Sequence, residues 1–225
     1  MWYLFLKLAE HPLPERRWPD MTVDVCLHEV TGATEAEDRF IRDSVVLLRT
    51  AVSSAGFGAS VRNADYGFSG WQSLHGGVRD MDGDAIWERI VHGRECGKTA
   101  DHTLDISVSV EDLETPESGH AVIGRTRLGT LPIRSARWFV AQCMDAGDRV
   151  NMAAHLMHQW MHVSGFVHAP ENTGQDAPSV LARLVRRALE SDYGDEIDAK
   201  VTALLTLDTT DCDCCVASET DGLAA

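Results

Sequence analysis

The stretch HQWMHVSGFVH, residues 158–168, constrains the backbone more tightly than any other part of this 225-residue chain. Its first two histidines, His158 and His162, are four residues apart, so on a helix they lie on the same face. Gly165 then allows the positive φ angle with which a chain leaves a helix abruptly. The turn can bring His168 back towards the other two. The spacing therefore predicts a helix that ends near Gly165 and three imidazoles gathered at one point.

Three neutral imidazoles with one open coordination position are a ligand set of catalytic zinc. A structural zinc site normally has a fourth protein ligand, and this stretch supplies none. We therefore predict one zinc ion bound by His158, His162 and His168. The alternative is that these are ordinary histidines on a buried helix, because the other faces of the helix are apolar. His155 lies one turn earlier on the same face, and we expect it to support a ligand or line the cleft rather than bind metal.

The pattern His158-x-x-x-His162-x-x-Gly165-x-x-His168 resembles the extended zinc signature of the metzincin metallopeptidases, HExxHxxGxxH. The resemblance implies an α/β (α+β) zincin-like fold, with a twisted mixed β-sheet, long helices and a zinc-binding active-site helix. It implies a zinc ion that polarises the scissile carbonyl and supplies hydroxide. It also implies a peptide or protein substrate that pairs with an edge strand of the sheet. By position, the substrate-binding residues of that strand would be Gly124, Arg125 and Thr126.

Three departures from the family pattern bear on activity. Gln159 stands where the family has the glutamate that acts as general base, and a neutral amide cannot accept the proton. All seven methionines precede His168, so the methionine-containing turn that follows the third histidine in the family is missing. Ala169 follows the third histidine, where familiar subfamilies have more distinctive residues. Gln159 is either an engineered substitution or the natural residue, and the sequence leaves both open.

These features lead to one predicted function and two alternatives. The prediction is a zinc-dependent, metzincin-like metallopeptidase that is inactive or weakened in this form because position 159 is Gln. The first alternative is a metal-binding pseudoprotease that binds extended peptides without cleaving them. The second is a non-hydrolytic metalloenzyme with three histidine ligands, since imidazoles also suit iron and copper. Glu171 and Asp176 are the nearest spare carboxylates, and we interpret both as loop or helix-start acids.

Hydrophobic periodicity divides the chain into strands and helices. We expect strands at 22–29, 104–110, 121–134 and 137–142, and helices at 34–52, 84–93, 148–164 and 176–192. Thr34 and Glu37 form a capping box for the first helix, which should stop at residues 56–58. Asp84 can cap the second helix. Glycines and a proline interrupt the 121–134 segment, as expected of an edge strand with bulges.

We expect one domain with an extension at each end. Residues 1–20 form an N-terminal extension, and residues 21–205 form a single metzincin-like catalytic domain with an upper part (21–165) and a short lower part (166–205). Residues 206–225 form an acidic, flexible tail. The tail contains Cys212, Cys214 and Cys215, which fit a metal or redox site, a thiolate that reaches the zinc, or a loose end with free thiols. Cys26, Cys96 and Cys143 are scattered, and we expect them to be buried thiols.

The charge of the chain limits its partners. The net charge is −15, from 35 acidic and 20 basic residues. Such a surface repels nucleic acids and anionic membranes, so we expect neither as a partner. No apolar run approaches the roughly 20 residues that span a bilayer, and the first residues lack the apolar core of a secretion signal. We therefore expect a cytoplasmic protein.

Overall fold

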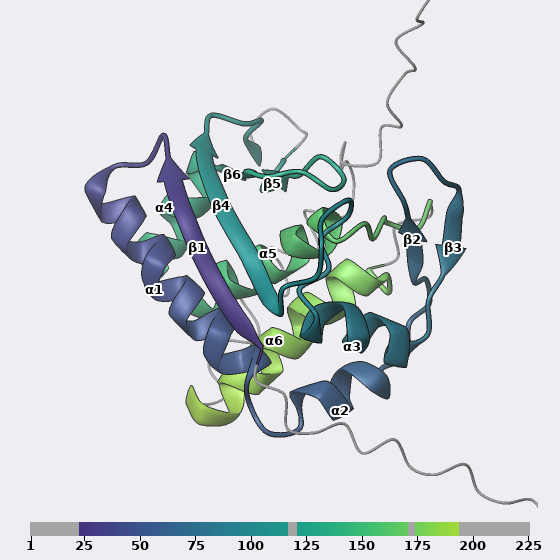
Figure 1. Cartoon of the computed structure of the whole chain (residues 1–225). Helices are drawn as coiled ribbons and strands as arrows, with labels where there is room; N and C mark the ends of the chain where they lie inside the picture. Colours follow the sequence, from purple (N-terminus) through teal and green to yellow (C-terminus); the bar gives the residue numbers. More distant parts are fainter. Residues whose placement is uncertain (1–22, 117–120, 171–173, 194–225) are drawn as a thin grey trace, which may run out of the picture.

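Four strands form a mixed sheet in the order β1-β4-β6-β5. A computed structural model describes residues 23–116, 121–170 and 174–193 of the chain (Figure 1). Strands β1, β4 and β6 run parallel, and β5 is antiparallel to β6 at one edge. A separate antiparallel pair consists of β2 and β3. The strands are β1 (Asp24–Thr31), β2 (Gly70–Gln72), β3 (Val78–Asp80), β4 (Thr103–Glu111), β5 (Gly124–Arg125) and β6 (Ile133–Ala136).

The described residues contain six helices, which makes the fold α+β. Figure 1 shows α1, α4, α5 and α6 on the far side of β1 and β4, while α2 and α3 lie beyond one end of these strands. Helix α5 packs against α1, α6 and the sheet, so it is the centre of the core. The helices are α1 (Glu35–Val52), α2 (Phe57–Arg62), α3 (Gly83–Val91), α4 (Arg137–Ala146), α5 (Arg149–Val163) and α6 (Ala177–Tyr193).

Several expected elements are confirmed. Strands β1 and β4 lie where apolar and polar residues alternate. Helix α1 begins with the predicted capping box, in which the Thr34 side chain accepts from the Glu37 amide and the Glu37 carboxylate accepts from the Thr34 amide. Helices α5 and α6 differ from the expected bounds by one residue at each end. Within the described ranges, none of the helices has the length and apolar content needed to cross a bilayer.

Other expectations are wrong. Residues 137–142 are the first turns of α4, not a strand. Phe139, Val140 and Cys143 are buried at helical spacing, which a six-residue window is too short to show.

The start of α3 and the edge of the sheet also differ from the expectations. Asp82, rather than Asp84, caps α3 by accepting from the Ala85 amide. The 121–134 segment does not form one bulged strand, since β5 and β6 are separate strands joined by a loop. Helix α2 was not expected. The N-terminal extension (1–20) and the cysteine-bearing tail (206–225) lie outside the described residues.

Strand β1 contains a bulge that changes which side chains face the core. Leu27 pairs with Ile106 and Glu29 with Ser107, so His28 is an extra residue without a partner in the register. Val25 and Leu27 face the helices, and the next residue to do so is Val30. The bulge therefore leaves His28 and Glu29 both exposed, whereas strict alternation would expose only one of them.

Candidate metal centre

Helix α5 carries two of the three predicted ligands through the middle of the core. Asp148 caps the helix by accepting a hydrogen bond of 2.8 Å from the Asn151 amide. Every residue from Val150 to Val163 is buried, because the helix is covered by other elements on all sides. His158 and His162 lie one turn apart, with ring centroids separated by 5.1 Å. Local sequence therefore fixes the relation between these two imidazoles.

The chain leaves α5 in the sharp turn that the sequence predicts. Gly165 has a φ of +105°. Its amide donates to the His162 carbonyl, and the Phe166 amide donates to the Met161 carbonyl. These two hydrogen bonds are those of a Schellman motif, which satisfies the last carbonyl groups of a helix. The motif reverses the chain direction within a few residues.

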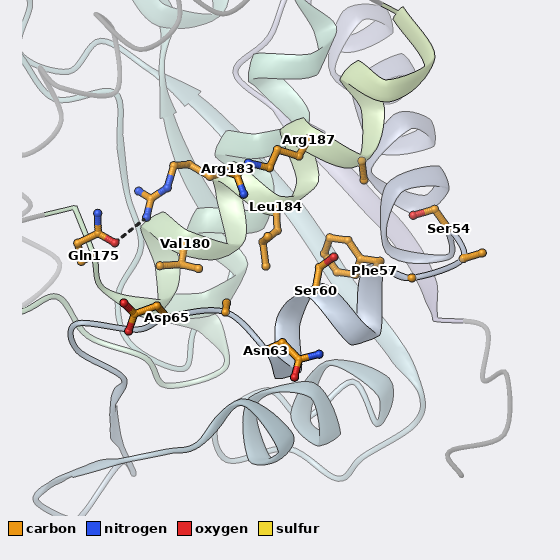
Figure 2. A pocket seen from close by; sticks show the side chains of 14 residues that line it. Ser54, Phe57, Ser60, Asn63, Asp65, Gln175, Val180, Arg183, Leu184 and Arg187 are labelled. Carbon is orange, nitrogen blue, oxygen red and sulfur yellow. Dashed lines mark hydrogen bonds between the residues drawn. The ribbon is translucent and has the colours of Figure 1, made fainter. Parts of the chain in front are cut away.

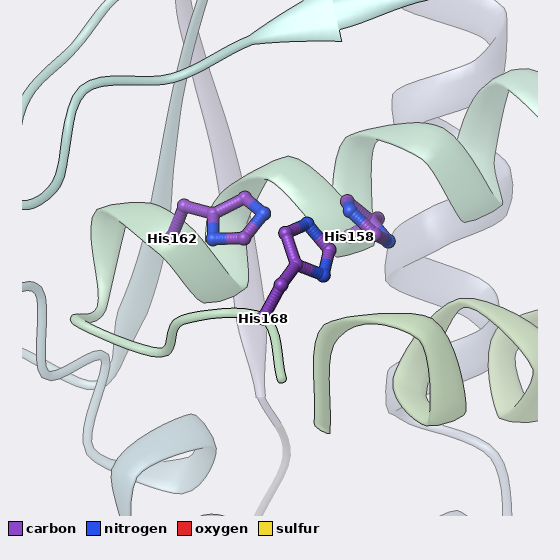
Figure 3. A group of neighbouring side chains, drawn as sticks. All are labelled: His158, His162 and His168. Atoms are coloured by element: carbon purple, nitrogen blue, oxygen red, sulfur yellow. The ribbon is translucent and has the colours of Figure 1, made fainter. Parts of the chain in front are cut away.

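Strand β2 holds the segment that follows the turn. The Gln72 amide donates to the Gly165 carbonyl, and the Val167 amide donates to the Gly70 carbonyl. The Trp71 indole donates to the Ser164 carbonyl at 2.8 Å. This pairing directs His168 back to the face of α5 that carries His158 and His162 (Figure 3). Its ring centroid lies 5.0 Å from that of His158 and 4.7 Å from that of His162.

Gly165 is also required by the close approach of β2, which gives a testable prediction. A Cβ atom at this position would lie 2.5 Å from Trp71 Nε1 and 2.8 Å from the Gln72 carbonyl oxygen, in a backbone conformation that L-residues avoid. Gly165→Ala should therefore lower the free energy of unfolding by at least about 2 kcal/mol. Gly147→Ala is the matched control, because Gly147 has a φ of +66° but no atom near the added Cβ. Urea denaturation measures both, and equal losses would contradict a steric role for β2.

The three histidines lie close enough together that they could hold a metal ion. One nitrogen of each lies within 4.8 Å of the others. Ligands at about 2.0–2.1 Å in a tetrahedral site are about 3.3–3.4 Å apart, so the three nitrogens would move closer together on binding an ion. The Nε2 atoms of His158 and His168 are buried without a hydrogen-bond partner. Unpartnered buried nitrogens are costly unless a ligand satisfies them.

Hydrogen bonds select the tautomer of two of the imidazoles. His162 Nδ1 donates to the Phe166 carbonyl at 2.8 Å, so Nε2 is the nitrogen that can bind a metal. His168 Nδ1 donates to Asp176 Oδ2 at 2.9 Å, which likewise assigns Nε2 to the metal. Metal-binding histidines in proteins commonly donate their other N–H to a carbonyl or carboxylate. Both contacts are therefore of the kind that orients metal ligands.

Burial keeps the imidazoles of α5 in the form that binds metal. Burial, with the nearby His168 ring as a second cause, lowers the pKa of His162 to about 3. Burial and the other two rings hold the pKa of His158 well below its usual value. For Asp176, burial alone would raise the pKa, but the hydrogen bond and charge of His168 outweigh it and lower the pKa. At neutral pH the site thus has neutral imidazoles on α5 and one ionised carboxylate behind His168.

Asp176 has a role that the sequence did not reveal. We expected a helix-start acid, and its Oδ1 does accept from the Ser179 amide at 2.9 Å at the start of α6. Its Oδ2 also accepts from His168, and the side chain is fully buried. No fixed spacing links the two residues, because the contact depends on how α6 packs against α5. The described residues do not include Glu171.

Replacing Asp176 tests this contact. In Asp176→Asn, one terminal atom becomes a donor, so the side chain cannot accept from both His168 and the Ser179 amide. We expect the zinc affinity to fall about 10–100-fold, the usual effect of removing such a partner. A competing chelator measures the dissociation constant, and Asp145→Asn, on the exposed end of α4, is the matched control. An unchanged dissociation constant would show that Asp176 acts only as a helix cap.

Gln159 lies between α5 and the edge strand. Its side chain is fully buried, and Oε1 accepts a hydrogen bond of 2.7 Å from Thr126 Oγ1. Nε2 is buried without a partner. A Cβ atom at Gly124 would lie 3.1 Å from Gln159 Nε2 and 2.5 Å from His155 Cε1, so α5 packs this closely only because residue 124 is glycine. The surroundings of position 159 thus offer one donor, from Thr126, and leave the second amide atom unsatisfied.

The remaining residues predicted from the sequence are those of the edge strand and His155. Gly124 and Arg125 form β5, which is the edge strand expected. Thr126 is buried against Gln159, and Arg125 makes a 3.0 Å ion pair with Glu114. We expected His155 to support a ligand or line the cleft rather than bind metal, and it is not part of the group that could hold a metal ion. It is buried between α5 and β6, and its Nε2 is 3.0 Å from Ser135 Oγ.

A cavity of about 810 Å³ lies between α2 and α6, away from the histidines (Figure 2). Arg183 and Arg187 project from α6 at its rim, and Phe57 and Leu184 form part of its apolar wall. None of the three histidines lines this cavity. The cavity is therefore separate from the candidate metal site.

Comparison of the chain with protein families, curated proteins and solved structures gives no match. The geometry alone therefore defines the class: an α+β protein in which a group of three histidines, two of them buried, could bind a metal ion.

Proposed function

We propose that the protein is a zinc-dependent, metzincin-like metallopeptidase, inactive or weakened in this form because position 159 is Gln. The observation that carries the proposal is the combination of three convergent histidines with hydrogen bonds that orient two of them. Zinc held by three imidazoles supplies a Lewis acid for a peptide carbonyl and acidifies a water molecule. The residues of the chain then have to place the substrate and move the proton.

The arrangement of the sheet supports a peptide substrate. In the metzincins, an edge strand next to the zinc helix pairs with an extended substrate. Strand β5 is an edge strand, and Thr126, the next residue, contacts Gln159 on α5. The side chain of Thr126 and the face of Gly124 point into the core, so substrate recognition here would use the backbone of β5. The element order, with a long helix and parallel strands before the edge strand, also resembles that family.

The surroundings of position 159 would accommodate a carboxylate as well as an amide. One terminal atom of the residue accepts from Thr126, and the other has no partner. A glutamate in the same place would accept from Thr126 with one oxygen and keep the second oxygen for a water molecule at the metal. The amide fills the same space but cannot take up a proton. Gln159 therefore explains a weakened enzyme without a change in the rest of the site.

A pseudoprotease that only binds peptides is the second candidate. It is favoured by Gln159 itself, whose Oε1 is well satisfied by Thr126. Both candidates bind zinc and an extended peptide, so neither binding measurement separates them. A non-hydrolytic enzyme is distinguished by its metal, since elemental analysis would find iron or copper instead of zinc.

Hydrolysis of a peptide library by the zinc-loaded Gln159→Glu protein tests the proposal. Cleavage by this variant supports the peptidase. A variant with zinc bound and no cleavage of any peptide would contradict the peptidase and favour the pseudoprotease. Adding His162→Ala to the Gln159→Glu variant removes a zinc ligand and should abolish the cleavage. Cleavage that persists in this double variant would come from a contaminating protease.

A further inference from the structure

A second group of reactive side chains lies on strands β1 and β4, away from α5. Cys26 and His28 come from β1, and Asp105 comes from β4 as the register partner of Cys26. Cys26 Sγ is 3.9 Å from His28 Nδ1, and His28 Nε2 is 2.8 Å from Asp105 Oδ1. A nucleophile, a base and a group that orients the base thus lie in one line of contacts.

The positions of Cys26 and His28 on β1 account for these contacts. Cys26 and His28 are two residues apart on the strand, so their side chains lie on the same face, opposite the one on which Val25 and Leu27 contact the helices. One ring nitrogen of His28 reaches Cys26 on the same strand and the other reaches Asp105 on the neighbouring strand. The face is open: 50% of the His28 side-chain surface and 15% of that of Asp105 are exposed.

Asp105 selects the tautomer that can accept a proton from sulfur. Burial would raise the pKa of Asp105, but hydrogen bonds from His28 and Lys98 outweigh it and lower the pKa, so the group is a carboxylate at neutral pH. A carboxylate accepts the Nε2–H of His28, which leaves Nδ1 as the acceptor that faces the Cys26 thiol. Lys98 Nζ lies 3.3 Å from Asp105 Oδ2, and Glu95 Oε1 accepts from the Asp105 amide. Both neighbours fix the position of the orienting residue.

The other thiols in the described residues lack this environment. Cys96 and Cys143 are buried, and burial raises the pKa of Cys143 to about 12. Cys26 is only partly buried, which corrects the expectation of a buried thiol. Accessible cysteines beside a histidine are the ones that react.

We propose that Cys26 is a modification site, a nucleophilic thiol that exchanges with low-molecular-weight disulfides with the help of His28 and Asp105. His28 Nδ1 takes the proton of the Cys26 thiol. The thiolate attacks one sulfur of the disulfide, a new S–S bond joins Cys26 to that half, and the old S–S bond breaks. The other half leaves as a thiolate and takes the proton from His28. The exchange is balanced without a further oxidant.

Peptide-resolved mass spectrometry on the full chain tests the proposal, because it follows each cysteine separately. We expect oxidised glutathione at pH 7 to modify Cys26 faster in the folded protein than in the urea-unfolded chain. Partial burial alone would slow the reaction in the folded protein, so a faster rate there indicates activation by His28 and Asp105. His28→Gln removes the base and should lower the Cys26 rate about tenfold. Asp105→Asn should also lower it, whereas His75→Gln, a change at an exposed histidine of the β2–β3 turn, should not.

Two results would overturn the proposal. The first is a Cys26 rate in the folded protein that is equal to or below that of the unfolded chain. The second is a rate that His28→Gln and His75→Gln change equally. Alkylation with iodoacetamide repeats the comparison with a reagent of different shape, so that access to one disulfide does not decide the outcome.

Discussion

A variant in which His158 and His162 are both changed to Ala should bind no zinc, whereas the parent protein should bind one ion per chain. The two imidazoles are adjacent on α5, and His168 alone offers a single ligand, which cannot hold zinc against solvent or buffer. Elemental analysis of the purified proteins measures the loss. Zinc retained at full occupancy in the double variant would show that the ligands have been assigned wrongly.

Metal binding should also stabilise the fold of the parent. A ligand that binds only the folded state at about 1,000 times its dissociation constant adds about 4.1 kcal/mol. For a chain of this size, that corresponds to a rise in melting temperature of roughly 10 °C. A chelator should therefore lower the melting temperature of the parent and leave that of the double variant unchanged.

The matched control uses a second pair of histidines in ring contact. His92 and His102 have ring centroids 4.8 Å apart but do not belong to the group that could hold a metal. Changing both to Ala removes as many imidazoles as the test variant does. This control should keep one zinc ion and the full response to the chelator. If it loses the metal as well, the effect is one of general destabilisation and not of ligation.

The parts of the site that depend on local sequence were predictable. His158, His162 and Gly165 are related by helix geometry and by one positive φ angle, so spacing alone was sufficient. The capping box of α1 and the alternation in β4 are local in the same sense. In each case, residues within four positions of one another determine the backbone.

The parts that depend on packing were not predictable. Thr126 and Gln159 are hydrogen-bonded although they are 33 residues apart in the sequence. Asp176 contacts His168 only because α6 packs against α5. Strand β6 lies between β4 and β5, so the order of strands in the sheet differs from their order in the chain, and one apolar segment became two strands. The bulge at His28 is visible in sequence only as an interval of three between Leu27 and Val30, which also fits a helix.

Gln159→Glu is expected to raise the rate of peptide hydrolysis by roughly 10²–10⁴-fold, the usual contribution of general-base catalysis. The change exchanges one amide nitrogen for an oxygen and keeps the shape of the side chain. Thr126 Oγ1 should still donate to one oxygen, which holds the carboxylate in the position now occupied by the amide. Burial raises the pKa of a carboxyl group, which brings it closer to neutral pH and makes it a better base.

The assay is turnover on an unbiased peptide library by zinc-loaded protein. Gln142→Glu, on the exposed side of α4, is the matched control, because it adds the same charge to the chain far from position 159. Gln142→Glu should leave the rate at the parent level. The double variant Gln159→Glu/His162→Ala should also stay at that level, since the carboxylate acts only on a water molecule activated by the metal.

The pattern of rates separates the candidate functions. If the rate rises in Gln159→Glu and the rise is lost when His162 is also changed, the carboxylate and the metal act in the same reaction. Gln159 is then the cause of the weakened activity. If the rate of hydrolysis does not rise in zinc-loaded Gln159→Glu, the amide at position 159 is not the sole cause of the low activity. The absent methionine turn and Ala169 would then mark a site that retains its metal ligands but no longer cleaves peptides. Because the Thr126 hydroxyl and the buried space suit a carboxylate as well as an amide, we expect the rise.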